Sequence, residues 1–392
     1  MYSIHDPDRY GFYLVADGKK FYNKLECIFY CQEKRLGFNW HFNDFFYDRL
    51  DWTKEPIADI QHLYDERARE LRLKYDYLIL HLSGGYDSGN VLETFLINNI
   101  KIDEILIRGP FKGTKADAAL NTVENTYAEV ELIAWPLAKL AKEKYQPHIR
   151  ITVVDTKELV ARKLVDVNDW FERGYHDLNF GGFFKNDPSV LDTRYQHMRD
   201  RGITVAHITG GEKPMFYIDH RKLCCVFEDE RLHKYSPLRD QNNLSNFQEP
   251  FYWAPDTGKM IIKQCHLILN YINNSNDPMK LATELMLHGG RKIDQWMSLL
   301  IYPKRTLPTW FCDKTSNTLM PQWDNWFFNN HNEEFYQIWK KSIEYIGNKL
   351  DTIYFKKRDY RQGFQRKVTK GRIIGEILQK QSLDLMQKNG QK

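Results

Sequence analysis

The short segment Ser83-Gly84-Gly85-Tyr86-Asp87-Ser88 combines residue types that together can hold a phosphate group. Gly84 and Gly85 have no Cβ, so backbone N–H groups at these positions can approach an anion closely. The hydroxyls of Ser83 and Ser88 offer further donors, and a helix beginning near Ser88 would direct the positive end of its dipole at the same anion. The segment therefore predicts a cradle of the size of a pyrophosphate.

Asp87 is the one residue of this segment that would repel a phosphate unless a cation lies between the two charges. ATP reaches proteins as its magnesium complex, and Mg²⁺ is bound by carboxylates together with phosphate oxygens. We therefore interpret Asp87 as a Mg²⁺ ligand, direct or through water. The segment is not a Walker loop, because no Gly-Lys-Ser or Gly-Lys-Thr follows it, so cleavage between the β and γ phosphates is not indicated.

The elements around the segment predict an α/β fold. Buried strands are expected at residues 77–82, 104–108, 148–154 and 204–208, with helices at 56–74, 89–98, 121–144 and 156–172. This alternation is typical of a parallel, doubly wound sheet with helices on both faces. Ligands of such sheets bind beyond the carboxyl ends of the strands, so the turn at Thr209-Gly210-Gly211 should meet the first loop in one crevice.

The pattern of expected helices and strands changes along the chain and divides it into three regions. Residues 1–56 predict a small N-terminal α+β segment, with a strand at 11–15 and a helix at 20–35, and residues 57–225 the ATP-binding α/β domain. Residues 226–392 predict a mainly helical substrate region, with helices at 263–273, 278–287 and 332–349.

The segment from Ser83 to Ser88 resembles the signature of the PP-loop ATP pyrophosphatase superfamily, whose sheet is of the HUP-like type. The resemblance covers roughly residues 76–217 and is specific for the superfamily, not for the substrate. It implies cleavage of ATP between the α and β phosphates: members adenylate a carboxylate or carbonyl oxygen, release pyrophosphate, and let a nucleophile displace AMP.

Two further motifs resemble the asparagine-synthetase-like branch. There the second strand ends at a glycine near the adenine, a position that Arg108-Gly109 fits. A later strand of that branch ends in a Gly-acid-Gly-x-Asp-Glu turn that helps to bind pyrophosphate and metal. The stretch Thr209-Gly210-Gly211-Glu212-Lys213 is similar but shorter and lacks the Asp-Glu pair. The resemblance makes Glu212 the substitute metal-binding carboxylate, and Lys213 the cation that would neutralise departing pyrophosphate.

The start of the chain departs from the glutamine-using asparagine synthetases. Their nucleophilic cysteine stands at the second position, where this chain has Tyr2, and about seventy residues before the loop cannot hold a glutaminase domain. The nitrogen donor would therefore be ammonia, an amine substrate or a partner subunit. The leading hypothesis is an AMP-forming ligase, similar to amide synthetases, in which Asp87, Glu212 and Lys213 act on ATP and Mg²⁺.

Two other functions remain open at this point. Eight basic residues in a short stretch favour a nucleic-acid-modifying enzyme of the same superfamily: Lys356, Lys357, Arg358, Arg361, Arg366, Lys367, Lys370 and Arg372. A nucleotide-binding protein that has lost catalysis would explain the shortened turn at Thr209.

Composition adds only broad limits. The net charge of +4 over 392 residues gives no general attraction to polyanions. The sequence shows neither a signal peptide nor an apolar run long enough to span a bilayer, so we expect a cytoplasmic protein without a membrane partner.

Overall fold

The computed structural model describes residues 11–109, 129–155, 189–211, 214–229, 248–287, 297–302, 334–358, 361–364 and 367–378. Its centre is a five-stranded parallel sheet in the order β10-β7-β4-β5-β6. The strands are β4 (Tyr77–His81), β5 (Glu104–Gly109), β6 (Arg150–Asp155), β7 (Val205–Thr209) and β10 (Gln248–Pro250). The prediction of an α/β fold with a parallel sheet is confirmed.

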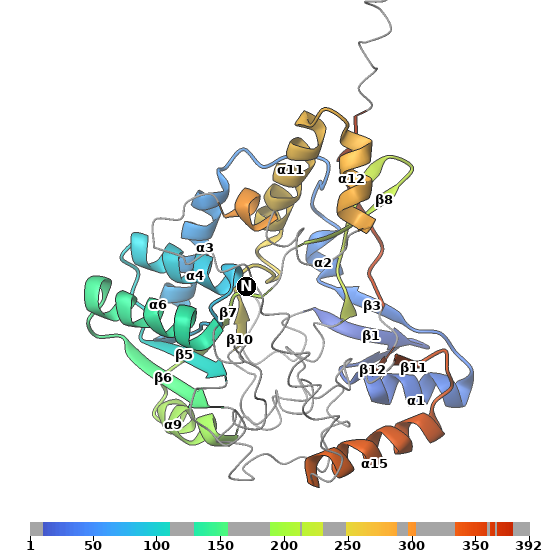
Figure 1. The fold of residues 1–392 in the computed structure, drawn as a ribbon, viewed down its shortest axis with the longest axis horizontal. Coiled ribbons are helices and arrows are strands. Elements are labelled where there is room, and N and C mark those ends of the chain that lie inside the picture. Colours follow the sequence, from blue (N-terminus) through green and yellow to red (C-terminus); the bar gives the residue numbers. More distant parts are fainter. Residues whose placement is uncertain are drawn as a thin grey trace, which may run out of the picture.

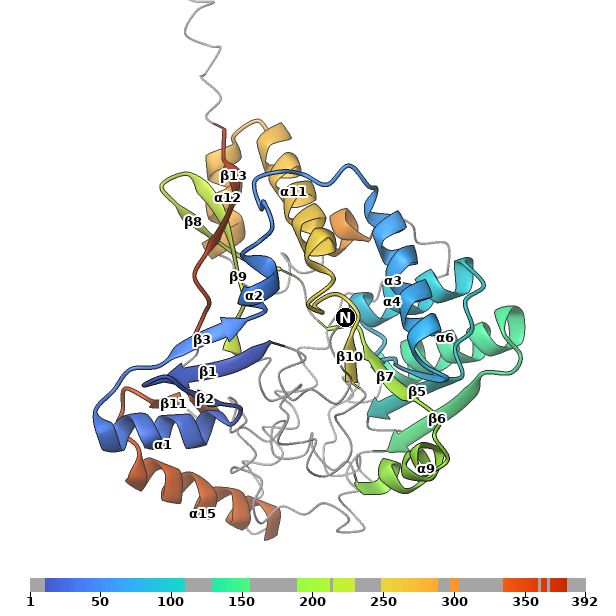
Figure 2. The ribbon, with the colours of Figure 1, turned by 180° about the vertical axis from the view of Figure 1, so that it is seen from behind.

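Both faces of this sheet are covered by helices. On one face lie α3 (Ile60–Lys74), α4 (Tyr86–Ile97) and α6 (Trp135–Leu140), and on the other lies α9 (Ser189–Asp200) (Figure 1, Figure 2). Because both faces are covered, Leu78, Ile79 and Leu80 of β4 are all fully buried. This burial explains why the strand reads as a continuous apolar run.

The edge strand β10 was not predicted from the sequence. It pairs in parallel with β7, with Gln248 opposite His207 and Pro250 opposite Thr209. The strand has three residues, a glutamine, a glutamate and a proline, so it offers neither an apolar run nor alternation. Proline is tolerated there because an edge strand leaves one side of its backbone unpaired.

The N-terminal segment forms a second, antiparallel sheet of β1 (Phe12–Ala16), β2 (Lys19–Phe21) and β3 (Asn39–Phe42). Helix α1 (Lys24–Lys34) begins four residues later than the sequence predicted. The delay has two causes: residues 19–21 pair with β1, and the side chain of Asn23 caps the helix by accepting hydrogen bonds from the amides of Leu25 and Glu26.

In the described part of the region beyond residue 226, three helices lie near the predicted positions, α11 (Gly258–Asn274), α12 (Pro278–Leu287) and α15 (Glu334–Lys349). The prediction of a mainly helical region is nevertheless incomplete, because strands β11 (Phe355–Arg358), β12 (Arg361–Phe364) and β13 (Arg372–Glu376) also occur there. Strand β13 pairs antiparallel with β9 (Lys222–Val226), which pairs in turn with β8 (Met215–Asp219). Among the described helices, none is long and apolar enough to cross a membrane.

Arg372, the last residue of the basic stretch, is bound within the protein. Its Nη2 lies 2.6 Å from Oδ1 of Asp44 and 2.8 Å from Oδ1 of Asp48, at either end of helix α2 (Asp44–Tyr47). Its guanidinium also lies over the ring of Trp52, 5.4 Å from the centroid. Arg372 therefore joins β13 to the N-terminal segment and is not available to a nucleic acid.

A buried ion pair makes a second connection of this kind and gives a testable prediction. Lys24 Nζ lies 2.7 Å from Oδ2 of Asp229, and both side chains are excluded from solvent. We expect Lys24→Met to reduce the free energy of unfolding by about 3–5 kcal/mol, because it leaves the charge of Asp229 buried without its partner. Urea unfolding of this variant and of Lys24→Met/Asp229→Leu checks the cause. The double variant should recover much of the loss, and an equally unstable double variant would contradict the explanation.

Candidate functional site

The order of the strands identifies one place on the sheet where a ligand is expected to bind. The chain passes outward from β4 through β5 to β6, then returns to the other side of β4 to form β7 and β10. The direction of winding therefore reverses between β4 and β7, and open α/β sheets bind ligands at the carboxyl ends of the strands at such a point. The two glycine-rich turns predicted to converge leave these two strands.

The loop after β4 is folded by its own serines. The Ser88 hydroxyl accepts a hydrogen bond from the Ser83 amide (3.2 Å) and donates to the Gly85 carbonyl (3.2 Å), while Ser83 Oγ accepts from the Gly85 amide (3.3 Å). Gly84 has a φ of +83°, which a residue with a Cβ rarely adopts. We expected Ser88 to face the ligand, but its side chain is buried and shapes the loop instead.

Helix α4 starts directly on this loop. Gly85 is its N-cap and provides no side-chain hydrogen bond, and the first helical residue is Tyr86, three positions earlier than predicted. The first amides of a helix have no carbonyl partner within the helix, so an uncapped N-terminus attracts anions. The earlier start also places Asp87 in the first turn of the helix.

The turn after β7 packs against that first turn of α4. A Cβ built on Gly210 would lie 2.8 Å from the carbonyl oxygen of Asp87 and 2.9 Å from the Cα of Ser88. Only a glycine allows the two backbones to come so close. The structure thus brings Thr209, Gly210 and Gly211 beside the loop, whereas Glu212 and Lys213 lie outside the described residues.

Among the described residues, two tyrosines contact Asp87 that the sequence did not indicate. The hydroxyl of Tyr302 donates to Oδ1 of the Asp87 carboxylate over 2.7 Å. The hydroxyl of Tyr252 donates to the main-chain carbonyl of Asp87 over 3.0 Å and accepts from Nδ2 of Asn90 over 2.9 Å. Both tyrosines belong to the C-terminal region, which therefore contributes directly to the surroundings of the loop.

Arg108 and Gly109 end β5, the neighbour of β4 on its other side. Gly109 pairs with Asp155 of β6 through the backbone. The charge of Arg108 acts on two histidines of the sheet, His81 and His207, whose protonated forms it disfavours. The strand register places Arg108 on the same face of the sheet as these histidines, because His81 pairs with Leu106, two residues before Arg108, and His207 pairs with Ile79, two residues before His81.

His81 and His207, at the ends of β4 and β7, form a pair. Nε2 of His81 lies 2.9 Å from Nδ1 of His207, so one ring donates and the other accepts. Burial, together with the positive charge of Arg108, lowers the pKa of His81 to about 3. Burial and the neighbouring His81 lower the pKa of His207 well below its usual range. Both rings are therefore neutral near pH 7.

The histidine pair predicts that the protein loses stability in mild acid. The unfolded chain binds protons below a pKa of about 6.5, whereas folded His81 stays neutral down to about pH 3, so the stabilisation is present above pH 6.5 and is lost as the pH falls towards 3. Between pH 7.5 and pH 5, His81 should account for about 2 kcal/mol of lost unfolding free energy, and His207 acts in the same direction.

Urea unfolding at the two pH values measures this loss, with the double variant His81→Gln/His207→Gln as the reference. The pH dependence of the double variant should be smaller by at least the contribution of His81. An identical pH dependence in both proteins would show that other groups cause it.

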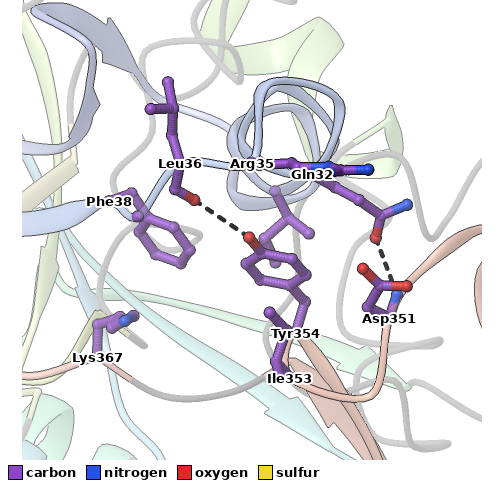
Figure 3. A pocket seen from close by; sticks show the side chains of 10 residues that line it. Gln32, Arg35, Leu36, Phe38, Asp351, Ile353, Tyr354 and Lys367 are labelled. Atoms are coloured by element: carbon purple, nitrogen blue, oxygen red, sulfur yellow. Dashed lines mark hydrogen bonds between the residues drawn. The ribbon is translucent and has the colours of Figure 1, made fainter.

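A cavity of about 550 Å³ lies in another part of the molecule, between the end of α1 and the segment that follows α15. Figure 3 shows the Tyr354 hydroxyl donating to the carbonyl of Leu36 (3.1 Å) and the side-chain carbonyl of Gln32 accepting from the Asp351 amide (2.8 Å). Lys367 of the basic stretch lines it and lies over the ring of Phe38. None of its described lining residues belongs to the loop or to the turn after β7.

The described residues contain no cluster of three or more His, Cys, Asp or Glu side chains that could hold a metal on their own. A magnesium ion bound with ATP does not need such a cluster, because phosphates and water supply most of its ligands. One or two carboxylates are enough, and Asp87 is the carboxylate that the loop provides.

Comparison of the chain with models of known protein families gave no match, and comparison with curated proteins gave none either.

Proposed function

We propose that this chain is an ATP-dependent, AMP-forming ligase of the PP-loop type. In the first half of the reaction, a carboxylate oxygen of the substrate attacks the α-phosphorus of ATP, the bond to the bridging oxygen of the β-phosphate breaks, and pyrophosphate leaves. In the second half, ammonia or an amine attacks the activated acyl carbon and loses a proton, and AMP departs with the electron pair of its bond. The observation that carries this proposal is the loop of Ser83–Ser88, which opens an uncapped helix at the point where the sheet reverses.

The residues present fit a magnesium–pyrophosphate group. Neither Gly84 nor Gly85 carries a Cβ that would obstruct an anion, and Ser83 at the start of the loop is exposed to solvent. The N-terminus of α4 adds a positive partial charge. Asp87 is partly exposed in the first turn and would hold the metal. When bound, Mg²⁺ would neutralise charge on the departing pyrophosphate.

The chain's own contribution in this proposal is positioning and charge stabilisation. The backbone of the loop and of the α4 N-terminus would bind the β and γ phosphates, and the close approach of Gly210 to Asp87 holds the first turn of α4 against the end of β7. Arg108-Gly109, at the end of β5, is proposed to border the adenosine part. Glu212 and Lys213 keep the roles that the sequence suggests, as second metal ligand and as cation for pyrophosphate.

The substrates that fit this reaction are a small carboxylate and an amine or ammonia, with the C-terminal region as the place where they are selected. A reaction that consumes ATP in this way is expected in the cytoplasm. The nucleic-acid-modifying alternative has a weaker basis than the sequence suggested, because Arg372 is bound by Asp44 and Asp48 and Lys367 lies over Phe38.

The test is a search for AMP and pyrophosphate. Purified protein is incubated with Mg²⁺, pools of carboxylates, ammonia or pooled amines, and ATP labelled at the α-phosphate or, in a parallel reaction, at the γ-phosphate, and the products are separated. AMP and pyrophosphate in equal amounts, formed only with an acceptor pool and absent for Asp87→Asn, would support the ligase. AMP formed only when tRNA or DNA is added would identify the nucleic-acid-modifying alternative. Binding of ATP without AMP in any mixture would identify a nucleotide-binding protein.

A further inference from the structure

Three tyrosines from separate parts of the chain meet beneath the first turn of α4. Tyr64 comes from α3, Tyr252 follows β10, and Tyr302 lies far beyond α12; their ring centroids are 5.7 to 6.1 Å apart. All three are almost completely buried, at 2 % exposure or less. Their packing fixes the rings, so the two hydroxyls that reach Asp87 are held in place by the core.

Each hydroxyl has a defined partner. Tyr64 donates to the carbonyl of Ile301 (2.7 Å) and thereby fixes the backbone next to Tyr302. Tyr252 holds the main chain of Asp87, and Tyr302 holds its carboxylate. Of the three hydroxyls, that of Tyr302 is the one that donates to the side-chain carboxylate of Asp87, the group that would bind a metal.

A carboxylate that already accepts a short hydrogen bond at one oxygen is poorly suited to bind a metal through both. Mg²⁺ requires a near-ideal octahedron with ligands about 2.0–2.1 Å away and is usually bound through single carboxylate oxygens, whereas Ca²⁺ is larger and accepts both oxygens of one carboxylate. The Tyr302 hydroxyl lies 2.7 Å from Oδ1, takes up one lone pair of that oxygen and weakens it as a second metal ligand.

We propose that Tyr302 is a positioning residue that sets the metal preference of the site, because its hydroxyl donates to Oδ1 of Asp87 and so disfavours the binding of a metal through both carboxylate oxygens. The inference rests on the proposed function, in which Asp87 binds the metal of ATP. It adds a role for the C-terminal region: a residue there selects Mg²⁺ over Ca²⁺.

The experiment measures binding of a fluorescent ATP analogue during titration with Mg²⁺ and, separately, with Ca²⁺. In the wild-type protein, Mg²⁺ should support binding at a concentration at least about 10-fold lower than Ca²⁺. In Tyr302→Phe, the Mg²⁺ concentration at half-saturation should rise about 10- to 100-fold, the usual effect of removing a residue that orients a metal ligand. The Ca²⁺ curve should shift less, so the preference for Mg²⁺ narrows.

Tyr47→Phe is the matched control. Tyr47 is also fully buried and its hydroxyl also donates one hydrogen bond, to the carbonyl of Ala254 (2.9 Å), but it does not contact Asp87. Both variants should lose similar thermal stability, and only Tyr302→Phe should change the preference for Mg²⁺ over Ca²⁺. Because Asp87 is partly exposed, its carboxylate remains in contact with solvent after the substitution, and we expect Tyr302→Phe to fold.

The outcomes separate the two proposals. If the wild-type protein binds no ATP with either metal, the proposed function fails. If the wild-type protein binds ATP equally well with Mg²⁺ and Ca²⁺, the metal preference is absent and this inference is wrong, whether or not the variant folds. If Mg²⁺ is preferred but the curves of Tyr302→Phe match those of the wild type or of Tyr47→Phe, Tyr302 has no such role.

Discussion

Gly210→Ala should weaken binding of ATP with Mg²⁺ by about 100-fold and reduce the free energy of unfolding by about 1–3 kcal/mol. The new methyl group would lie 2.8 Å from the carbonyl oxygen of Asp87 and 2.9 Å from the Cα of Ser88. Both contacts are with backbone, so no side-chain rotation relieves them, and the first turn of α4 must move away from β7. Calorimetric titration with ATP and urea unfolding measure the two effects.

Gly89→Ala provides the control for this substitution. Gly89 lies in the same helix, two residues after Asp87, but a Cβ built there meets no atom within 4 Å. Alanine is a better helix former than glycine, so this variant should gain about 0.5–1 kcal/mol and bind ATP as the wild type does. If Gly210→Ala also bound ATP normally, the close approach of the two turns would not matter for the nucleotide.

Asp87→Asn should lose the metal-dependent part of ATP binding while the fold is retained. The amide oxygen of asparagine can still accept the hydrogen bond from Tyr302, so the local packing survives, but the charge that attracts Mg²⁺ is gone. We expect at least the 10- to 100-fold loss known for residues that only orient a metal ligand. The measurement compares ATP affinity with Mg²⁺ and with a chelator, and the stabilisation by ATP in thermal unfolding.

Asp65→Asn serves as the comparison for Asp87→Asn. Asp65 is also partly buried, and its Oδ1 accepts hydrogen bonds from the side-chain amides of Gln61 and Asn98 (both 2.8 Å), away from the loop. This variant should keep the full magnesium dependence. A normal response to Mg²⁺ in Asp87→Asn would remove the basis for assigning the metal to this carboxylate.

The strands of the central sheet could be predicted where burial on both faces produces an apolar run, as in β4 with Leu78, Ile79 and Leu80. The edge strand β10 could not, because its residues Gln248–Pro250 carry no such pattern. Helix α1 starts later than the sequence predicts because Lys19–Phe21 pairs with β1. Strand pairing here overrides the local preference of these residues for a helix. Strand β13 was missed for a related reason: its partner β9 lies about 150 residues earlier.

The candidate site, like the fold, could be predicted from the sequence only where the contacts are local. The loop of Ser83–Ser88 was predicted because its chemistry is local, and glycine and serine act through neighbouring backbone. The hydrogen bonds from Tyr252 and Tyr302 to Asp87 join residues 165 and 215 positions apart, and no spacing rule indicates them. The hydrogen bonds of the Ser88 side chain within the loop could not be predicted, because the sequence reveals which donors are present but not which acceptors lie within reach.

The pairing of β13 with β9 has a consequence for how this protein emerges from the ribosome. Residues 222–226 are synthesised early and remain without their partner strand until residues 372–376 have left the exit tunnel. Arg372 reaches Asp44 and Asp48 only at that same late moment. Until then one edge of β9 is unsatisfied and exposed to other nascent chains, so a premature stop before residue 372 should yield an aggregating fragment.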